Sequence, residues 1–130
     1  MSRPAKAIVD LAAVRHNYQF AQRLAPKAKT LGVVKANAYG HGAVAVAKTL
    51  ESLTPLLAVA CIEEALELRA AGIQKPILLL EGAFEKSEIA VASQENFWLM
   101  ASGIEQVQSL IETKTQQPIH VWLKADSGMH

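Results

Sequence analysis

The sequence lacks the features that would assign it to a nucleic-acid-binding, membrane or disulfide-linked class of protein. Its 130 residues include 13 Lys and Arg against 12 Asp and Glu, and a net charge of +1 gives no bulk attraction to nucleic acid or anionic lipid. The single cysteine, Cys61, excludes an internal disulfide and a cysteine-based metal site. No apolar run approaches the roughly 18 residues of a membrane span, and no signal-peptide core is present. We therefore expect a cytoplasmic globular domain without nucleic-acid, membrane or metal partners.

The sequence instead contains a series of short apolar runs. They centre near residues 33, 59, 79, 99 and 121, and segments with helical periodicity separate most of them. A spacing of about 20 to 26 residues is typical of strand–helix units. Strands that are apolar on both faces predict a parallel sheet covered by helices, which is an α/β fold. Two architectures fit this pattern: an open doubly wound sheet, complete at this length, and the first part of a (β/α)8 barrel.

Local signals predict the limits of several elements. Residues 7–9 form a short apolar run typical of a strand, and Asp10 is a suitable N-cap for a helix that extends to Leu24. Ser102 and Glu105 have the spacing of a capping box at the start of a later helix.

The residues most suited to chemistry follow the first run of the series. Lys35 stands at the carboxyl end of a predicted buried strand, where both architectures place their active sites, and a partly desolvated amine there is a nucleophile. Tyr39 offers a phenol, and Gly40 and Gly42 flank a helix entry that can receive an anion. These groups suit a phosphorylated aldehyde, the ligand class of pyridoxal phosphate (PLP). The residues alone also fit a solvated lysine beside an ordinary turn, and they favour a helix-starting role for His41 over a phosphate contact.

Residues 33–42, Val-Val-Lys-Ala-Asn-Ala-Tyr-Gly-His-Gly, resemble the PLP-lysine signature of bacterial alanine racemases. Residues 10–18, 63–78 and 123–129 are similar to further segments of the same family, with Ser127 in place of its usual threonine. The resemblance spans essentially the whole chain. It implies that residues 1–130 are part of an N-terminal PLP-binding (β/α)8 TIM barrel, and that the family's mostly β C-terminal domain is absent from this chain.

The resemblance also implies roles for individual residues. Lys35 would bind PLP as a Schiff base and then act as one of two catalytic bases, while Tyr39 would hydrogen-bond the cofactor phosphate. Lys124 matches a lysine that many members carry as a carbamate, an anion that orients an arginine toward the substrate carboxylate. Leu80, at the end of its predicted strand, is a further candidate for cofactor contact. The implied activity is the racemisation of L-alanine and D-alanine by a homodimeric isomerase, which would either supply D-alanine as a peptidoglycan precursor or serve in the degradation of L-alanine.

Part of the family's machinery has no counterpart in this sequence. The second base, a tyrosine supplied by the C-terminal domain of the partner subunit, lies outside the chain, which stops at His130 in an unfinished turn. We therefore expect a truncated chain that is inactive on its own. Three alternatives stay open: a non-catalytic PLP-binding barrel protein, a racemase of serine or of broader specificity, and an interaction module without a cofactor.

Overall fold

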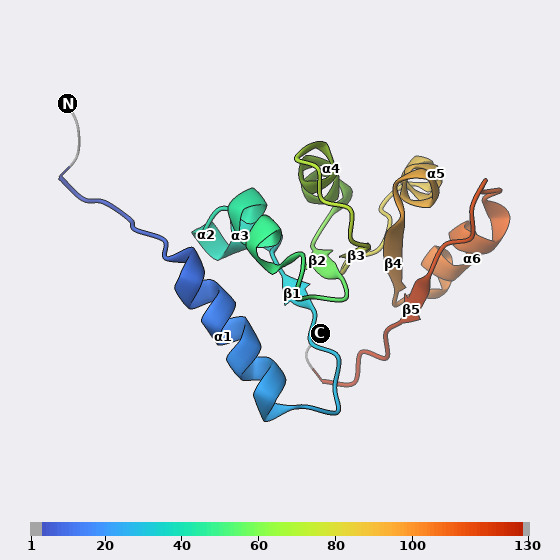
Figure 1. Ribbon diagram of the computed structural model, residues 1–130. Coiled ribbons are helices and arrows are strands. Elements are labelled where there is room, and N and C mark those ends of the chain that lie inside the picture. The colour runs from blue at the N-terminus through green and yellow to red at the C-terminus, as the bar shows by residue number, and fades with distance from the viewer. Residues whose placement is uncertain (1–3, 129–130) are drawn as a thin grey trace.

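The computed structural model describes residues 4–128. The unfinished turn at His130, from which we expected a truncated chain, lies outside the described residues. After the first helix, strands alternate with helical segments, and α2 and α3 together separate the first two strands (Figure 1). In chain order the elements are α1 (Leu11–Leu24), β1 (Gly32–Val33), α2 (Lys35–Gly40), α3 (Ala43–Leu50), β2 (Leu57–Val59), α4 (Ile62–Ala70), β3 (Ile77–Leu79), α5 (Lys86–Glu95), β4 (Phe97–Ala101), α6 (Ile104–Glu112) and β5 (Val121–Leu123). Each of the five predicted strand centres falls inside an observed strand.

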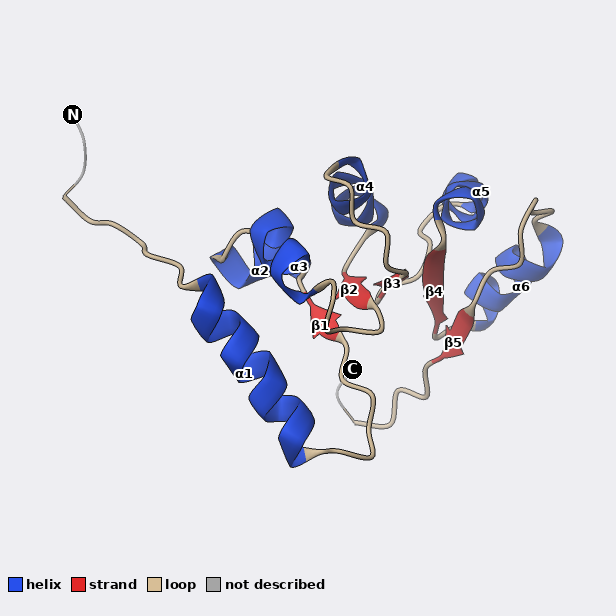
Figure 2. Ribbon diagram, viewed as in Figure 1, coloured by secondary structure: helices blue, strands red, loops and turns tan. Residues whose placement is uncertain are grey.

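The five strands form one parallel sheet in the order β1-β2-β3-β4-β5. A doubly wound sheet reverses its strand order at a switch point, whereas a barrel adds each strand beside the preceding one. Figure 2 shows the sheet curving with helices α3 to α6 on its outer side. The partial-barrel alternative is therefore confirmed, and the doubly wound alternative is wrong.

Successive side chains of a strand point to opposite sides of the sheet. Because the strands consist of apolar residues, both faces of the sheet are apolar. The outer face packs against the helices through fully buried residues: Leu57, Ile77, Leu79, Phe97 and Leu99. The inner face carries a second cluster built on Leu56, Ala58 and Leu78, with Leu31, Leu80, Trp98 and Met100 packed against it. Trp122, on β5, keeps 40% of its surface exposed beside a cavity of about 270 Å³ on this inner face.

The first helix begins where the sequence predicts, but the residues before it do not form a strand. Asp10 Oδ1 accepts hydrogen bonds from the backbone N–H groups of Ala12 and Ala13 at 2.8 and 3.2 Å, as expected of an N-cap. Residues 7–9 are exposed, Ile8 by 89%, and they pair with none of the strands within residues 4–128. The predicted strand is wrong because an apolar run without a neighbouring strand has no partner for its backbone groups.

The predicted capping box at the start of α6 is also wrong. The N-cap is Gly103, and no side chain caps it. Gln106 Oε1 accepts a hydrogen bond from the backbone N–H of Ser102 at 2.9 Å, while Gln106 Nε2 donates to the carbonyl oxygen of Glu81 at 2.8 Å. Gln106 therefore accepts the hydrogen bond from the Ser102 backbone that the spacing predicted for the Glu105 side chain.

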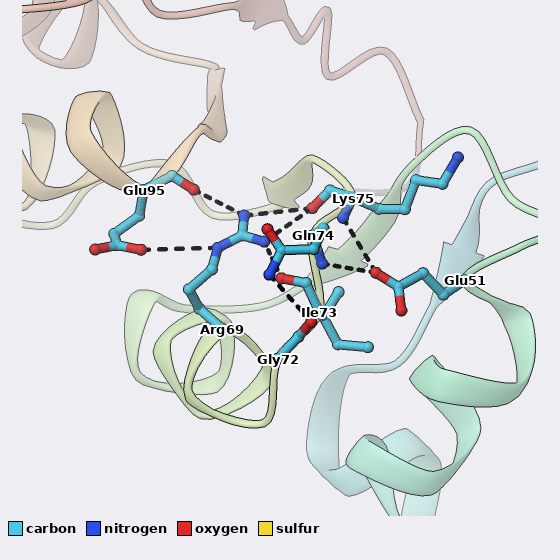
Figure 3. A network of polar contacts seen from close by, with 7 residues as sticks. All are labelled: Glu51, Arg69, Gly72, Ile73, Gln74, Lys75 and Glu95. Atoms are coloured by element: carbon cyan, nitrogen blue, oxygen red, sulfur yellow. Dashed lines mark hydrogen bonds and ion pairs between the residues drawn. The ribbon is translucent and has the colours of Figure 1, made fainter.

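A polar network stabilises the amino edge of the sheet, where the strands begin (Figure 3). Arg69, on α4, donates to the carbonyl oxygens of Ile73 and Lys75 in the loop before β3, and to that of Glu95 before β4. Its guanidinium lies 5.3 Å from the centre of the Phe97 ring. Burial lowers the pKa of Arg69, and the nearby Glu95 carboxylate opposes that effect.

Arg69→Met should lower the free energy of unfolding by about 3 kcal/mol, because it leaves carbonyl oxygens in a partly buried loop without a charged donor. Chemical denaturation of the complete protein measures this. Arg15→Met, at an exposed position of α1, is the matched control and should change stability by less than about 0.5 kcal/mol. Equal effects of the two substitutions would show that the network contributes no stability.

Candidate active site

Lys35 lies at the carboxyl edge of the sheet, two residues after the end of β1, and is half-buried. The preceding residue, Val34, is fully buried, and its N–H donates to the carbonyl oxygen of Ala58 on β2 at 2.8 Å. The strand therefore fixes the backbone up to the residue before the lysine. This edge is where barrel enzymes place their catalytic groups, and the position matches the sequence prediction.

The segment after Lys35 is a left-handed helical turn, which the sequence did not reveal. Ala36, Asn37, Ala38 and Tyr39 all have φ between 50° and 54° and ψ between 39° and 50°. Each residue that is not glycine costs about 1–2 kcal/mol in this conformation. Hydrogen bonds offset part of that cost, including one of 2.9 Å from the N–H of Ala38 to the oxygen of Val34. Such strained segments persist where surrounding contacts determine them, and they are frequent at functional sites.

The turn presents Tyr39 to solvent and then leads directly into α3. Tyr39 is 62% exposed, so its phenol is accessible to a ligand. Asn37 Oδ1 accepts the N–H of Ala43, the first residue of α3, at 2.8 Å. His41 Nδ1 instead lies 3.0 Å from the carbonyl oxygen of Ala38, inside the turn. The helix-starting role predicted for His41 is therefore wrong, because Asn37 satisfies that amide.

The other two predicted site residues stand at the same edge but on more distant strands. Leu80 follows β3, packs with the inner cluster, and donates its N–H to Val59 at 2.9 Å. Lys124 follows β5, is exposed, and donates its N–H to Ala101 at 2.8 Å. At about 4.8 Å per strand, β3 lies about 10 Å and β5 about 19 Å from β1 along the sheet. Within the sheet, two strand spacings therefore separate Leu80 from Lys35, whereas four separate Lys124 from it.

Glu64 also belongs to this edge, and the sequence pattern gave it only a general role at the start of a helix. Its Oε1 accepts the N–H of Ala36 at 2.7 Å, and its Oε2 accepts the N–H of Ala60 at 2.8 Å. The first contact joins residues 28 positions apart, and no local signal predicts such a pairing.

Other reactive groups do not form a competing site within residues 4–128. Burial is the main cause that raises the pKa of the Cys61 thiol, so little of the nucleophilic thiolate is present at neutral pH. The described residues hold no cluster of three or more His, Cys, Asp or Glu side chains able to bind a metal ion. None of the helices in the described part of the chain is both long and apolar enough to cross a membrane.

Comparison with known proteins agrees with this fold. The family described as "Alanine racemase, N-terminal domain" matches residues 9–130. Over 128 residues, 98% of the chain, it is 54% identical to the catabolic alanine racemase of Pseudomonas putida and 57% identical to an alanine racemase of Xylella fastidiosa. The crystal structure of the biosynthetic alanine racemase of Pseudomonas aeruginosa is 51% identical and superposes with a TM-score of 0.88 over 94% of the chain.

The chain spans only about a third of these relatives, 36% of the Pseudomonas putida protein and 34% of the Pseudomonas aeruginosa structure. The match nevertheless includes the whole sheet and the lysine-bearing turn at its carboxyl edge. Sequence, fold and family match thus lead to one conclusion: the chain belongs to the alanine racemase family, and its residues are part of the family's N-terminal domain.

Proposed function

We propose that this chain is the cofactor-binding part of a PLP-dependent isomerase that interconverts L-alanine and D-alanine. The observation that carries the proposal is the half-buried Lys35 at the carboxyl end of β1, followed by a left-handed turn that exposes Tyr39. The relatives of this sequence are named alanine racemases, which supports alanine as the substrate.

The residues at this edge fit the chemistry of PLP. A primary amine suits the aldehyde of the cofactor, and an exposed phenol suits its phosphate. Leu80 belongs to the apolar inner cluster and offers a surface for the pyridine ring. The fit therefore rests on three groups of different character that one edge of the sheet presents together.

Lys35 has two tasks in this proposal. Its Nζ would hold the cofactor covalently through the aldehyde carbon, and it would later take a proton from, or return one to, the Cα of alanine on one face. When bound, PLP supplies the electron sink that makes the Cα proton acidic. The contribution of the protein is to hold the amine at a fixed position beside that carbon.

Tyr39 and Lys124 would orient the reactants. The Tyr39 hydroxyl would donate a hydrogen bond to a phosphate oxygen and so limit rotation of the cofactor about its lysine linkage. Lys124, as a carbamate, would change from a cation to an anion and hold an arginine that faces the substrate carboxylate. Residues 1–130 would thus supply one face of the active site as part of a barrel. The second base would come from a C-terminal β domain of a partner subunit in a cytoplasmic homodimer.

Borohydride reduction followed by peptide mass analysis tests the cofactor assignment. The complete protein, isolated from its natural source, should carry a pyridoxyl group on the peptide that contains Lys35, because reduction makes the lysine linkage irreversible. Lys48, an exposed lysine of α3, should stay unmodified and serves as the internal control. An unmodified Lys35 in protein with bound PLP would contradict the proposal.

The 130-residue chain alone should show no racemase turnover, because it holds one of the two bases that the proposal requires. Polarimetric or coupled assays of the purified chain with added PLP measure this. Turnover at the rate of the complete protein would show that the second base lies within these residues. Exchange of the alanine Cα hydrogen with deuterated water by the complete protein separates the racemase from a PLP-binding protein without turnover.

A further inference from the structure

Glu64 joins two strand ends with a single carboxylate. It is the third residue of α4, it is half-buried, and its two oxygens have different partners. Oε1 accepts the N–H of Ala36 at 2.7 Å, and Oε2 accepts the N–H of Ala60 at 2.8 Å. A carboxylate that only favours the helix dipole needs neither contact, so the geometry indicates a specific structural role.

The Ala36 amide is part of the peptide bond that follows Lys35 directly. It also opens the left-handed turn, in which four consecutive residues adopt a conformation that L-amino acids rarely populate. Within residues 4–128, the bond from Ala36 to Glu64 is the only hydrogen bond described that ties the turn's backbone to a side chain of another element. The entry to the turn is therefore held from outside by Glu64.

The second oxygen connects this turn to the neighbouring strands. Ala60 follows β2 at the carboxyl edge, and its carbonyl oxygen accepts the N–H of Glu81, the residue after Leu80, at 3.3 Å. Glu64 thus lies in a chain of hydrogen bonds that runs from the Lys35–Ala36 peptide across β2 to the end of β3. A shift of Glu64 would change the position of Lys35 relative to Leu80.

We propose that Glu64 is a positioning residue for Lys35, which fixes the lysine backbone and the start of the left-handed turn against the ends of β2 and β3. This inference rests on the proposed function, because it concerns how the Lys35 amine is presented to the cofactor. Misplacement of a reacting group by about 1 Å can cost about 100-fold in rate. Glu64 acts through the backbone and touches neither substrate nor cofactor in this proposal.

Glu64→Gln is the direct test, because a carboxamide keeps the size of the side chain but offers one acceptor oxygen in place of two. Glu63→Gln is the matched control: it removes the same charge from the same helix turn, at an exposed position. In the complete protein, we expect Glu64→Gln to raise the PLP dissociation constant about 10-fold and to lower kcat by about 10- to 100-fold. The KM for alanine should change less than about threefold. Glu63→Gln should leave all three within about twofold of the wild type.

Hydrogen exchange of the cofactor-free complete protein adds a readout that is independent of activity. Peptides that cover residues 35–42 should exchange about 10-fold faster in Glu64→Gln than in the wild type, and at wild-type rates in Glu63→Gln. Glu64→Asp keeps the carboxylate with a shorter reach, so it should restore part of both the protection and the PLP affinity. It also provides the comparison if Glu64→Gln does not fold.

The outcomes separate this inference from the proposed function. Unchanged exchange in Glu64→Gln would overturn the positioning role, and so would faster exchange with unchanged PLP affinity and kcat. Absence of a pyridoxyl adduct on Lys35 in the wild type would instead overturn the proposed function, whatever the exchange of residues 35–42 shows.

Discussion

If the proposed function is right, Lys35→Ala should reduce racemisation by the complete protein by about 10⁴-fold or more, because the proposal assigns to Lys35 both the covalent attachment of the cofactor and one catalytic base. Alanine has no side-chain amine, and no other lysine lies between the end of β1 and the start of α3. The variant should still fold, since Lys35 is half-buried and none of the packing clusters includes its side chain. The assay compares kcat of the variant and the wild type with L-alanine at saturating PLP.

Lys48→Ala is the control for this substitution. Lys48 lies on α3 close in sequence, is exposed, and has no proposed role, so kcat should stay within about twofold of the wild type. The characteristic absorbance of the lysine–PLP linkage should disappear in Lys35→Ala and persist in Lys48→Ala. Substantial racemisation without that absorbance would show that another residue carries the proton transfer.

Gly82→Ala should destabilise the barrel by about 4 kcal/mol, the largest loss of stability that we expect from a single methyl group. Gly82 lies between β3 and α5 with φ of 74°, a region that disfavours every residue with a Cβ. An added Cβ would also lie 2.3 Å from the carbonyl oxygen of Met100 on β4, and that backbone atom cannot move aside easily. Conformational strain and steric overlap therefore act together at this position.

Gly72→Ala separates these two contributions. Gly72 has a comparable φ of 93°, but an added Cβ there would meet no atom within 4 Å. It should cost only about 1–2 kcal/mol, the conformational term alone. Thermal unfolding of the complete protein gives both values under one condition. If the two substitutions lower the melting temperature equally, the close approach of Gly82 to β4 makes no contribution.

Periodicity and composition predicted much of the fold. The apolar runs predicted all five strands because the strands of a parallel sheet covered by helices are near-continuous apolar runs, although β5 is exposed along its length in this chain. The order of the strands could not be predicted from periodicity, since an open sheet and a barrel use the same strand–helix unit. The predicted strand over residues 7–9 failed for a related reason: an apolar run indicates a strand only where another strand lies beside it.

The candidate site was only partly predictable. Lys35 and Tyr39 were proposed from their place after a predicted buried strand and from the resemblance of residues 33–42 to a known family. The left-handed turn was not, because alanine has no preference for positive φ and the surrounding contacts impose that conformation. Glu64 was missed because a carboxylate near a helix start is ordinarily explained by the helix dipole. Its contact with the N–H of Ala36 forms only when β1 and β2 are paired, so local sequence does not predict it.

The consecutive order of the strands has a consequence for how the protein is made. Each strand pairs with the one that precedes it in the chain, so its partner was synthesised only about 20 residues earlier. The sheet can therefore grow by one strand and one helix at a time as the polypeptide leaves the ribosome, without waiting for distant sequence. At every stage the newest strand is an open edge, and rapid arrival of the next unit shortens the time during which that edge can pair with another nascent chain.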